Sequence, residues 1–169
     1  MAKNQTLKIT EMDRYLFGQG THYEIYKLMG AHPTKQKGKD GVYFAVWAPR
    51  AQEVAVVGDF NGWDPEKNIM KCDNDMGIYQ LFIPGVKSGD LYKFCITSPS
   101  GELLYKADPY ANYAEKRPGN ASRVYDIKNF KWNDSVWMKN RQNYDVNKDA
   151  MSIYEVHPGS WSKHPQNDH

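Results

Sequence analysis

Residues 41–64, GVYFAVWAPRAQEVAVVGDFNGWD, contain two short runs rich in β-branched and aromatic side chains. The first run ends at Pro49, which cannot donate a hydrogen bond within a sheet, and the second extends over residues 53–60. The dipeptide Asn61-Gly62 follows, and this pair favours a tight turn. The stretch therefore predicts two strands and a turn, with Trp63 placed directly after the turn.

Further strands are predicted on the C-terminal side of this stretch. In residues 78–85 apolar side chains alternate, with Tyr79, Leu81 and Ile83 on one face. Residues 90–97 show the same alternation, which directs Tyr92, Phe94 and Ile96 to one face and Leu91, Lys93 and Cys95 to the other. Residues 98–109 read as a hairpin into a short strand, and residues 122–127 as a last strand. Several short strands separated by Gly, Pro and Asn turns predict an all-β fold, an antiparallel β-sandwich.

The two flanks of the sandwich differ from it in pattern. Residues 1–37 are expected to be helical. The main helix has a capping box at Thr21 and Glu24, apolar side chains at helical spacing (Ile25, Leu28 and Met29) and a C-cap at Gly30. A shorter helical turn is expected over residues 12–17. Residues 38–127 are expected to form the sandwich. Residues 128–169 are expected to be a polar linker followed by MSIYEVHPGSW (151–161), a truncated C-terminal strand that belongs to a domain outside this sequence. The chain is therefore expected to be a fragment of a longer protein.

Composition excludes several function classes. With 22 basic and 20 acidic side chains and no basic stripe, the chain offers no electrostatic case for nucleic acid or for a membrane surface. The N-terminus lacks the apolar core of a signal peptide, and the two cysteines, Cys72 and Cys95, are interpreted as free thiols. A cytoplasmic location is expected.

Metal, cofactor and catalytic motifs are not found. The stretch DNDMG (73–77) begins like a calcium loop, but Pro84 stands where the closing Glu should be, so a turn is predicted. The five histidines match no zinc spacing, and no phosphate-binding or nucleophile motif occurs. Glycoside chemistry requires two facing carboxylates, and nothing pairs Glu155 with Asp108. We therefore predict no catalytic residue, no metal and no cofactor.

Four residues are candidates for binding a sugar. A glucose unit has apolar ring faces and a rim of hydroxyls, so its site needs exposed aromatic planes and polar groups at their edges. Trp63 and Tyr105 offer the planes, and Lys93 and Asn120 offer the polar groups. Each also has a purely structural interpretation: Trp63 as a core plug under its turn, Lys93 as a solvated charge, Tyr105 as packing and Asn120 as a turn residue. Trp47 is expected to lie in the core.

The segments GVYFAVWAPRAQEVAVVGDFNGWD, LYKFCI (91–96) and KADPYA (106–111) resemble carbohydrate-binding module family 48. That resemblance implies an immunoglobulin-like β-sandwich that binds α-1,4-glucan such as glycogen or maltooligosaccharide through Trp63, Lys93, Tyr105 and, in the last loop, Asn120. Tyr105 departs from the Trp often found in glycogen-binding members.

The flanks DRYLFGQGTHYEIYKLMGAHP (13–33) and MSIYEVHPGSW resemble the bacterial 1,4-α-glucan (glycogen) branching enzyme family. This resemblance implies a parent protein that cleaves α-1,4 links and forms α-1,6 branches. Its catalytic domain would be a (β/α)₈ barrel that packs with the module as its partner, and this chain is expected to lack that barrel. The chain alone is then expected to bind glucan weakly and to be inactive. A free-standing glycogen-targeting module and a structural sandwich without sugar binding remain alternatives.

Overall fold

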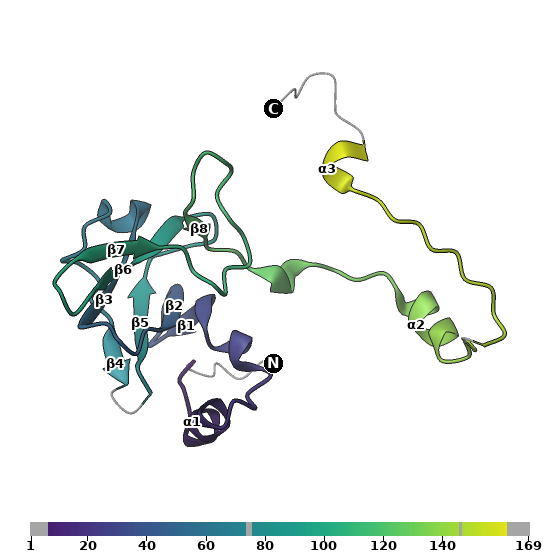
Figure 1. Cartoon of the computed structure of the whole chain (residues 1–169), viewed down its shortest axis with the longest axis horizontal. Coiled ribbons are helices and arrows are strands. Elements are labelled where there is room, and N and C mark those ends of the chain that lie inside the picture. Colours follow the sequence, from purple (N-terminus) through teal and green to yellow (C-terminus); the bar gives the residue numbers. More distant parts are fainter. Residues whose placement is uncertain (1–6, 74–75, 146, 162–169) are drawn as a thin grey trace. The chain divides into compact units, whose positions relative to one another are not determined.

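The computed structural model describes residues 7–73, 76–145 and 147–161. Two compact units divide the chain, residues 1–129 and 130–169. In the described part of the first unit, eight strands form two antiparallel sheets, whose strands are labelled in Figure 1. The first sheet has the strand order β1-β2-β5-β4, and the second has the order β3-β6-β7, with β8 also paired to β6. The predicted immunoglobulin-like antiparallel sandwich is confirmed.

The strands have the following bounds. The first sheet contains β1 (Gly30–Gln36), β2 (Lys39–Trp47), β4 (Lys71–Asp73) and β5 (Ile78–Pro84). The second contains β3 (Glu53–Gly58), β6 (Leu91–Thr97), β7 (Leu103–Lys106) and β8 (Ser122–Arg123). Every strand expected within residues 41–127 is present, although β8 is shorter than predicted.

The core between the sheets follows the period-two pattern. Phe44 of β2 and Tyr79 of β5 pack from one sheet against Val56, Tyr92 and Phe94 of the other. Phe44 and Tyr92 meet edge to face, with ring centroids 5.1 Å apart. Because neighbouring side chains of a strand point to opposite faces, burying Tyr92 and Phe94 turns Lys93 and Cys95 to the outer face of the second sheet.

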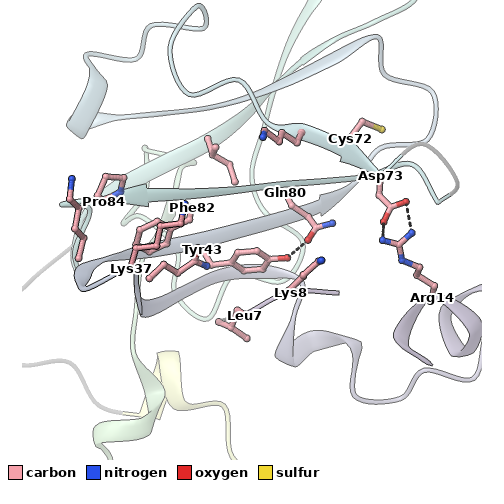
Figure 2. Close-up of a pocket in the computed structure, with 14 residues that line it drawn as sticks. Leu7, Lys8, Arg14, Lys37, Tyr43, Cys72, Asp73, Gln80, Phe82 and Pro84 are labelled. Atoms are coloured by element: carbon pink, nitrogen blue, oxygen red, sulfur yellow. Dashed lines mark hydrogen bonds and ion pairs between the residues drawn. The ribbon is translucent and has the colours of Figure 1, made fainter. Parts of the chain in front are cut away.

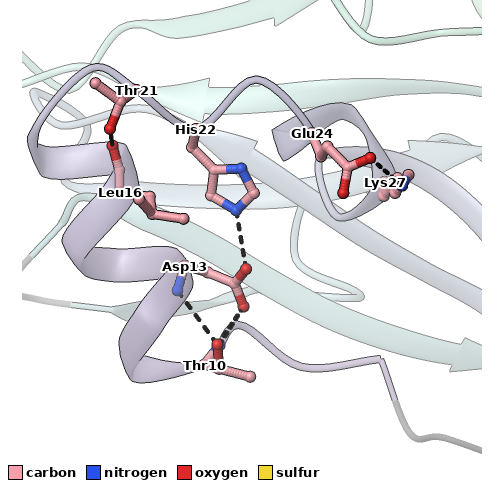
Figure 3. A network of polar contacts seen from close by, with 7 residues as sticks. All are labelled: Thr10, Asp13, Leu16, Thr21, His22, Glu24 and Lys27. Atoms are coloured by element: carbon pink, nitrogen blue, oxygen red, sulfur yellow. Dashed lines mark hydrogen bonds and ion pairs between the residues drawn. The ribbon is translucent and has the colours of Figure 1, made fainter.

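The N-terminal helix differs from the prediction. Helix α1 (Glu11–Gly18) is present, and its capping box is formed by Thr10 and Asp13. The expected helix after Thr21 is instead a single 3-10 turn, η1 (Ile25–Lys27). Thr21 does not cap a helix but donates its hydroxyl to the carbonyl of Leu16, near the end of α1 (Figure 3).

Gly30, the predicted helix C-cap, is the first residue of β1, so the prediction of helix here is wrong. Residues 30–36 pair with β2 along their full length, from Gly30 opposite Ala45 to Gln36 opposite Lys39. The segment shows no alternation of apolar side chains that would reveal a strand. Pairing with the strongly apolar β2 decides its conformation, since tertiary context overrides weak local propensity.

The outer face of the first sheet is covered at one end by the N-terminal segment. Ile9, Phe17 and Met29 pack there against Ala45 and Ile78. Asp13 stabilises this cover: it bonds Thr10, and its Oδ1 lies 2.8 Å from His22 Nε2 (Figure 3). Burial alone would raise the pKa of Asp13, but these hydrogen bonds hold it below its usual value.

Trp47 does not lie in the core, contrary to expectation. It follows the inward-facing Val46 and therefore points to the outer face of the first sheet, where its side chain is 54% exposed. Phe17 contacts it edge to face, and the indole N–H donates to the carbonyl of Met76 at 3.1 Å. A single neighbouring ring at the end of the sheet is too small to bury an indole.

The second unit contains α2 (Ser135–Arg141) and α3 (Pro158–Trp161). Of residues 151–161, predicted as the truncated strand, the last four form α3, and residues 151–157 have no partner strand in the described part of the chain. Their apolar side chains are exposed, Ile153 at 85% and Tyr154 at 75%. A strand forms only where another strand accepts its backbone hydrogen bonds, so an apolar sequence alone does not create one.

Of the loop predicted at 73–77, residues 74 and 75 lie outside the described part of the chain. Met76 and Gly77 donate backbone hydrogen bonds to the carbonyl of Asp73, as a turn requires. Among the described residues no cluster of His, Cys, Asp or Glu could hold a metal ion. None of the helices described is long and apolar enough to cross a bilayer.

Candidate functional site

The side chain of Asn61 stabilises the loop that carries Trp63. Strand β3 ends at Gly58, the 3-10 turn η2 (Asp59–Asn61) follows, and Gly62 adopts the left-handed conformation at φ +71°. Asn61 Oδ1 accepts from the backbone N–H of Gly58 at 3.0 Å, and its Nδ2 donates to the carbonyl of Val56 at 2.9 Å. The Asn-Gly pair therefore makes the predicted turn, with the Asn side chain as its internal brace.

Gly58 allows the turn to start at this point. An added Cβ would lie 2.2 Å from the carbonyl oxygen of Leu91 and 2.6 Å from the Phe60 ring. Only a residue without a side chain lets β3 pass so close to β6 here. The turn therefore sits directly against the strand that carries Lys93.

Trp63 lies half-buried on the outer face of the second sheet. One side of its ring packs on Ala55, Val57 and Cys95, and its indole N–H donates to Asp59 Oδ1 at 3.0 Å. The residue has φ +61°, a left-handed conformation that is costly for a bulky side chain. The ring is thus neither a plug within the sandwich nor a free surface side chain, because it packs on the outer face of the sheet and is intermediate in exposure.

Lys93 and Tyr105 are both neighbours of Cys95 on the outer face of the second sheet. Lys93 stands two residues before Cys95 on the same face of β6, and Tyr105 of β7 is directly opposite Cys95 in the ladder. Residues opposite each other in an antiparallel ladder share a face. Tyr105 is 46% exposed. Burial raises the pKa of the Cys95 thiol, and the proximity of Cys95 raises the pKa of Tyr105, so both groups are protonated at neutral pH.

Asn120 completes the group from the loop before β8. Lys93 Nζ donates a hydrogen bond to Asn120 Oδ1, which joins two residues 27 positions apart. The amide nitrogen of Asn120 and the remaining N–H groups of Lys93 are left as donors. The structure therefore brings all four predicted residues to one face of one sheet, where two partly exposed aromatic rings are flanked by hydrogen-bond donors.

Two features of this site were not predicted from the sequence. Asp59 accepts the indole hydrogen bond, and Cys95 is the apolar floor beneath the ring. The hydrogen bond from Trp63 to Asp59 could have been predicted, because the two residues lie close together in sequence on either side of the predicted turn. The contact of Trp63 with Cys95 links residues 32 positions apart, and local pattern could not indicate it.

Comparison with known proteins agrees with this geometry. Residues 28–111 match the family model of carbohydrate-binding module 48 (Isoamylase N-terminal domain). The matched range contains Trp63, Lys93 and Tyr105 but ends before Asn120. The sandwich therefore belongs to the carbohydrate-binding module 48 family.

The similarity to curated proteins extends over almost the whole chain. The 1,4-alpha-glucan branching enzyme GlgB of Butyrivibrio fibrisolvens is 59% identical over 96% of this chain, and that of Halothermothrix orenii is 51% identical over 95%. In each case the chain spans 25% of the relative's length. A solved structure of a putative alpha amylase from Salmonella typhimurium matches 64% of this chain and 16% of its own at 26% identity, with a TM-score of 0.48. The chain corresponds in sequence to the N-terminal region of GlgB-type branching enzymes.

Proposed function

We propose that the sandwich binds α-1,4-glucan on the outer face of its second sheet, with Trp63 as the main contact. The observation that carries this proposal is the indole of Trp63, which packs on Cys95 on the outer face of the sheet, is held at its N–H by Asp59 and remains partly exposed. A held aromatic plane suits the apolar face of a glucose ring. Lys93 and Asn120 supply donors for its hydroxyls, and Tyr105 supplies a second plane.

We further propose that the chain serves a branching enzyme, which cleaves α-1,4 links and forms α-1,6 branches. The names of its relatives support this proposal. In the complete enzyme a (β/α)₈ barrel would hold the catalytic carboxylates, and the sandwich would keep glucan near it. The chain alone is expected to show no turnover in a branching assay. The reducing cytoplasm is the proposed compartment, consistent with two free cysteines.

A free-standing targeting module is the weaker alternative. The similarity to branching enzymes continues well beyond the matched residues 28–111, over 162 residues. A structural sandwich that binds no sugar is the other alternative, and it is favoured only by the partial burial of Trp63. Binding measurements separate it from the proposal.

The test is a titration of the chain with maltoheptaose or β-cyclodextrin, followed by NMR shifts or calorimetry. A single aromatic platform gives weak binding, with a dissociation constant on the order of 0.1–1 mM. Trp63→Ala should weaken it by about tenfold, since one ring contact contributes about 1 kcal/mol or more. Trp132→Ala is the matched control, because Trp132 is 76% exposed and lies in the second unit.

Thermal unfolding of both variants completes the experiment. The proposal requires Trp63→Ala to lose affinity while the sandwich still unfolds cooperatively. If the unchanged chain does not bind either ligand and Trp63→Ala is strongly destabilised, then Trp63 is a structural plug and the sugar site does not exist.

A further inference from the structure

A second groove lies on the other sheet, away from the candidate glucan site. It has a volume of about 970 Å³ and lies between Leu7 and Lys8 of the N-terminal segment and the outer face of β1-β2-β5-β4 (Figure 2). We call it the basic groove, because among the described residues five cationic side chains and one carboxylate line it: Lys8, Arg14, Lys37, Lys39, Lys71 and Asp73. Its size is within the usual range of small-molecule sites.

The lone carboxylate does not neutralise the lysines. Asp73 is already paired with Arg14, whose Nη2 lies 2.7 Å from Asp73 Oδ2. Asp73 is also nearly buried, with 7% of its side chain exposed, so its charge is directed at Arg14 and not at the groove. Four lysines, from the N-terminal segment, the β1–β2 turn, β2 and β4, therefore line the groove without an ion pair to the described part of the chain, with Lys71 opposite Gln80 and Lys39 at the other end of the sheet.

The floor of the basic groove adds another donor. Tyr43 donates its hydroxyl hydrogen to Gln80 Oε1 at 2.7 Å, which fixes the carboxamide and uses its acceptor (Figure 2). Burial raises the pKa of Tyr43, so the hydroxyl remains a donor at physiological pH. The Nε2 group of Gln80 makes no side-chain hydrogen bond with the described part of the chain and lines the groove. Figure 2 shows Gln80 descending from the sheet and Lys8 rising from the N-terminal segment towards the same space.

This set of groups selects a class of ligand. A neutral sugar hydroxyl both donates and accepts, but in the basic groove Gln80 Oε1 and Asp73 already accept from Tyr43 and Arg14, whereas the four lysines make no ion pair within the described part of the chain. A phosphoryl group only accepts when ionised and carries the opposite charge. Leu81, Phe82 and Pro84 line the same groove and offer an apolar surface for the organic part of a ligand.

We propose that the basic groove binds an organic phosphate of the size of a nucleotide or a sugar phosphate. The phosphoryl group lies between Lys8, Lys71 and the Gln80 amide, because Lys71 is directly opposite Gln80 in the ladder, and the organic part lies on Phe82. This site is separate from the Trp63 surface, which is on the other sheet, and it does not depend on glucan binding there.

The test is an NMR titration of the whole chain at low ionic strength with four probes: inorganic phosphate, glucose 1-phosphate, ADP and neutral maltotriose. The three phosphates should give saturable shifts at Gln80, Phe82 and their strand neighbours, and these shifts should weaken at about 0.5 M salt, where exposed charges are screened. Tighter binding of ADP than of glucose 1-phosphate would identify the ligand as a nucleotide. Tighter binding of glucose 1-phosphate would identify it as a phosphorylated sugar. Equal binding of inorganic phosphate would show that only the phosphoryl group is recognised.

The variant Lys8→Gln/Lys71→Gln removes the two charges beside Gln80 and should weaken phosphate binding by about tenfold, given typical exposed ion-pair strengths. The matched control Lys87→Gln/Lys116→Gln removes two exposed charges outside the groove and should leave binding within about twofold. The proposal is wrong if no phosphate gives saturable shifts, if both double variants weaken binding equally, or if maltotriose shifts the same amides as strongly as the phosphates.

Discussion

At the residue scale, Trp63 is held by opposing constraints. Its left-handed backbone conformation costs about 1 kcal/mol or more for a side chain of this size. The backbone N–H bond to the Gly58 carbonyl at 3.0 Å and the indole bond to Asp59 offset that cost. A ring fixed before the ligand arrives loses little side-chain entropy on binding. The position of the indole, and not merely its exposure, is therefore what favours a binding role.

The indole hydrogen bond gives a prediction about affinity without removing the ring. Asp59→Ala frees the indole to rotate, so glucan binding should weaken about threefold, as loss of one exposed hydrogen bond of roughly 0.5–1 kcal/mol implies. Calorimetry with maltoheptaose measures this change. Asp59→Asn keeps a carbonyl acceptor at the same place and should bind like the unchanged chain. Equal affinity in all three proteins would show that Asp59 does not position Trp63.

At the scale of elements, the turn after β3 depends on one side chain. Asn61 bonds the Gly58 N–H, the Val56 carbonyl and, at 2.7 Å, Asn68 Oδ1. It thus joins the end of β3 to the strand-like segment that returns beside it, where Ala55 bridges Ile69. Because these backbone groups are partly buried, no solvent molecule readily replaces the carboxamide.

Replacing Asn61 should therefore destabilise the sandwich and loosen the Trp63 loop together. Asn61→Ala is expected to lower the free energy of unfolding by about 2 kcal/mol, because it leaves partly buried polar groups unpaired. Urea unfolding followed by fluorescence measures this loss. Asn112→Ala, at an exposed asparagine of the same unit, should change stability by less than about 0.5 kcal/mol. A similar effect of both substitutions would contradict the brace assigned to Asn61.

At the scale of the whole sandwich, a buried polar link ties the long β7–β8 connection to the core. Tyr92, fully buried in β6, donates its hydroxyl to Asp108 Oδ2 at 2.6 Å, and the Asp108 backbone N–H donates to Ser122 Oγ at 2.8 Å. Burial raises the pKa of Asp108, although hydrogen bonds from Tyr92 and from the Tyr110 N–H act in the opposite direction. The loop that delivers Asn120 is therefore anchored through a carboxyl group in the interior.

This link makes a pH-dependent contribution to stability whose sign can be stated. The folded pKa of Asp108 lies above its unfolded value of 3.8, so between the two values the folded chain binds more protons than the unfolded chain. The Asp108 contribution is then fully present below 3.8 and is lost as pH rises through the raised pKa.

The difference in unfolding free energy between the unchanged chain and Asp108→Asn isolates this contribution from those of other carboxyl groups. The unchanged chain should gain relative to the variant as pH falls from 7 to 3.5, measured by urea unfolding at each pH. A difference that does not vary with pH, or that shrinks on acidification, would show that the pKa of Asp108 is not raised. Asp13, whose pKa is lowered, acts in the opposite sense in both proteins and cancels in the comparison.

The amino-acid sequence by itself determined the sandwich and the side of the sheet that carries Lys93. Alternation is a local property, since each residue's face follows from its neighbour's, so burying Tyr92 and Phe94 turns Lys93 outward whatever else the chain does. The Asn-Gly turn is local in the same sense, because the Asn side chain bonds backbone groups within a few residues of itself. The position of Trp63 at the end of that turn was therefore predictable.

The tertiary structure alone decided the features that depend on pairing between distant segments. Residues 30–36 form a strand because β2 accepts their hydrogen bonds, and Trp47 stays half-exposed because Phe17 and the Met76 carbonyl cover only part of its side chain. Residues 151–157 have the composition of a strand but no described partner, so they do not form one. The basic groove exists because the fold brings Leu7 and Lys8 of the N-terminal segment beside Gln80 and Phe82 of the sheet. Each outcome depends on which surface another part of the chain covers, and local sequence pattern carries no information about that.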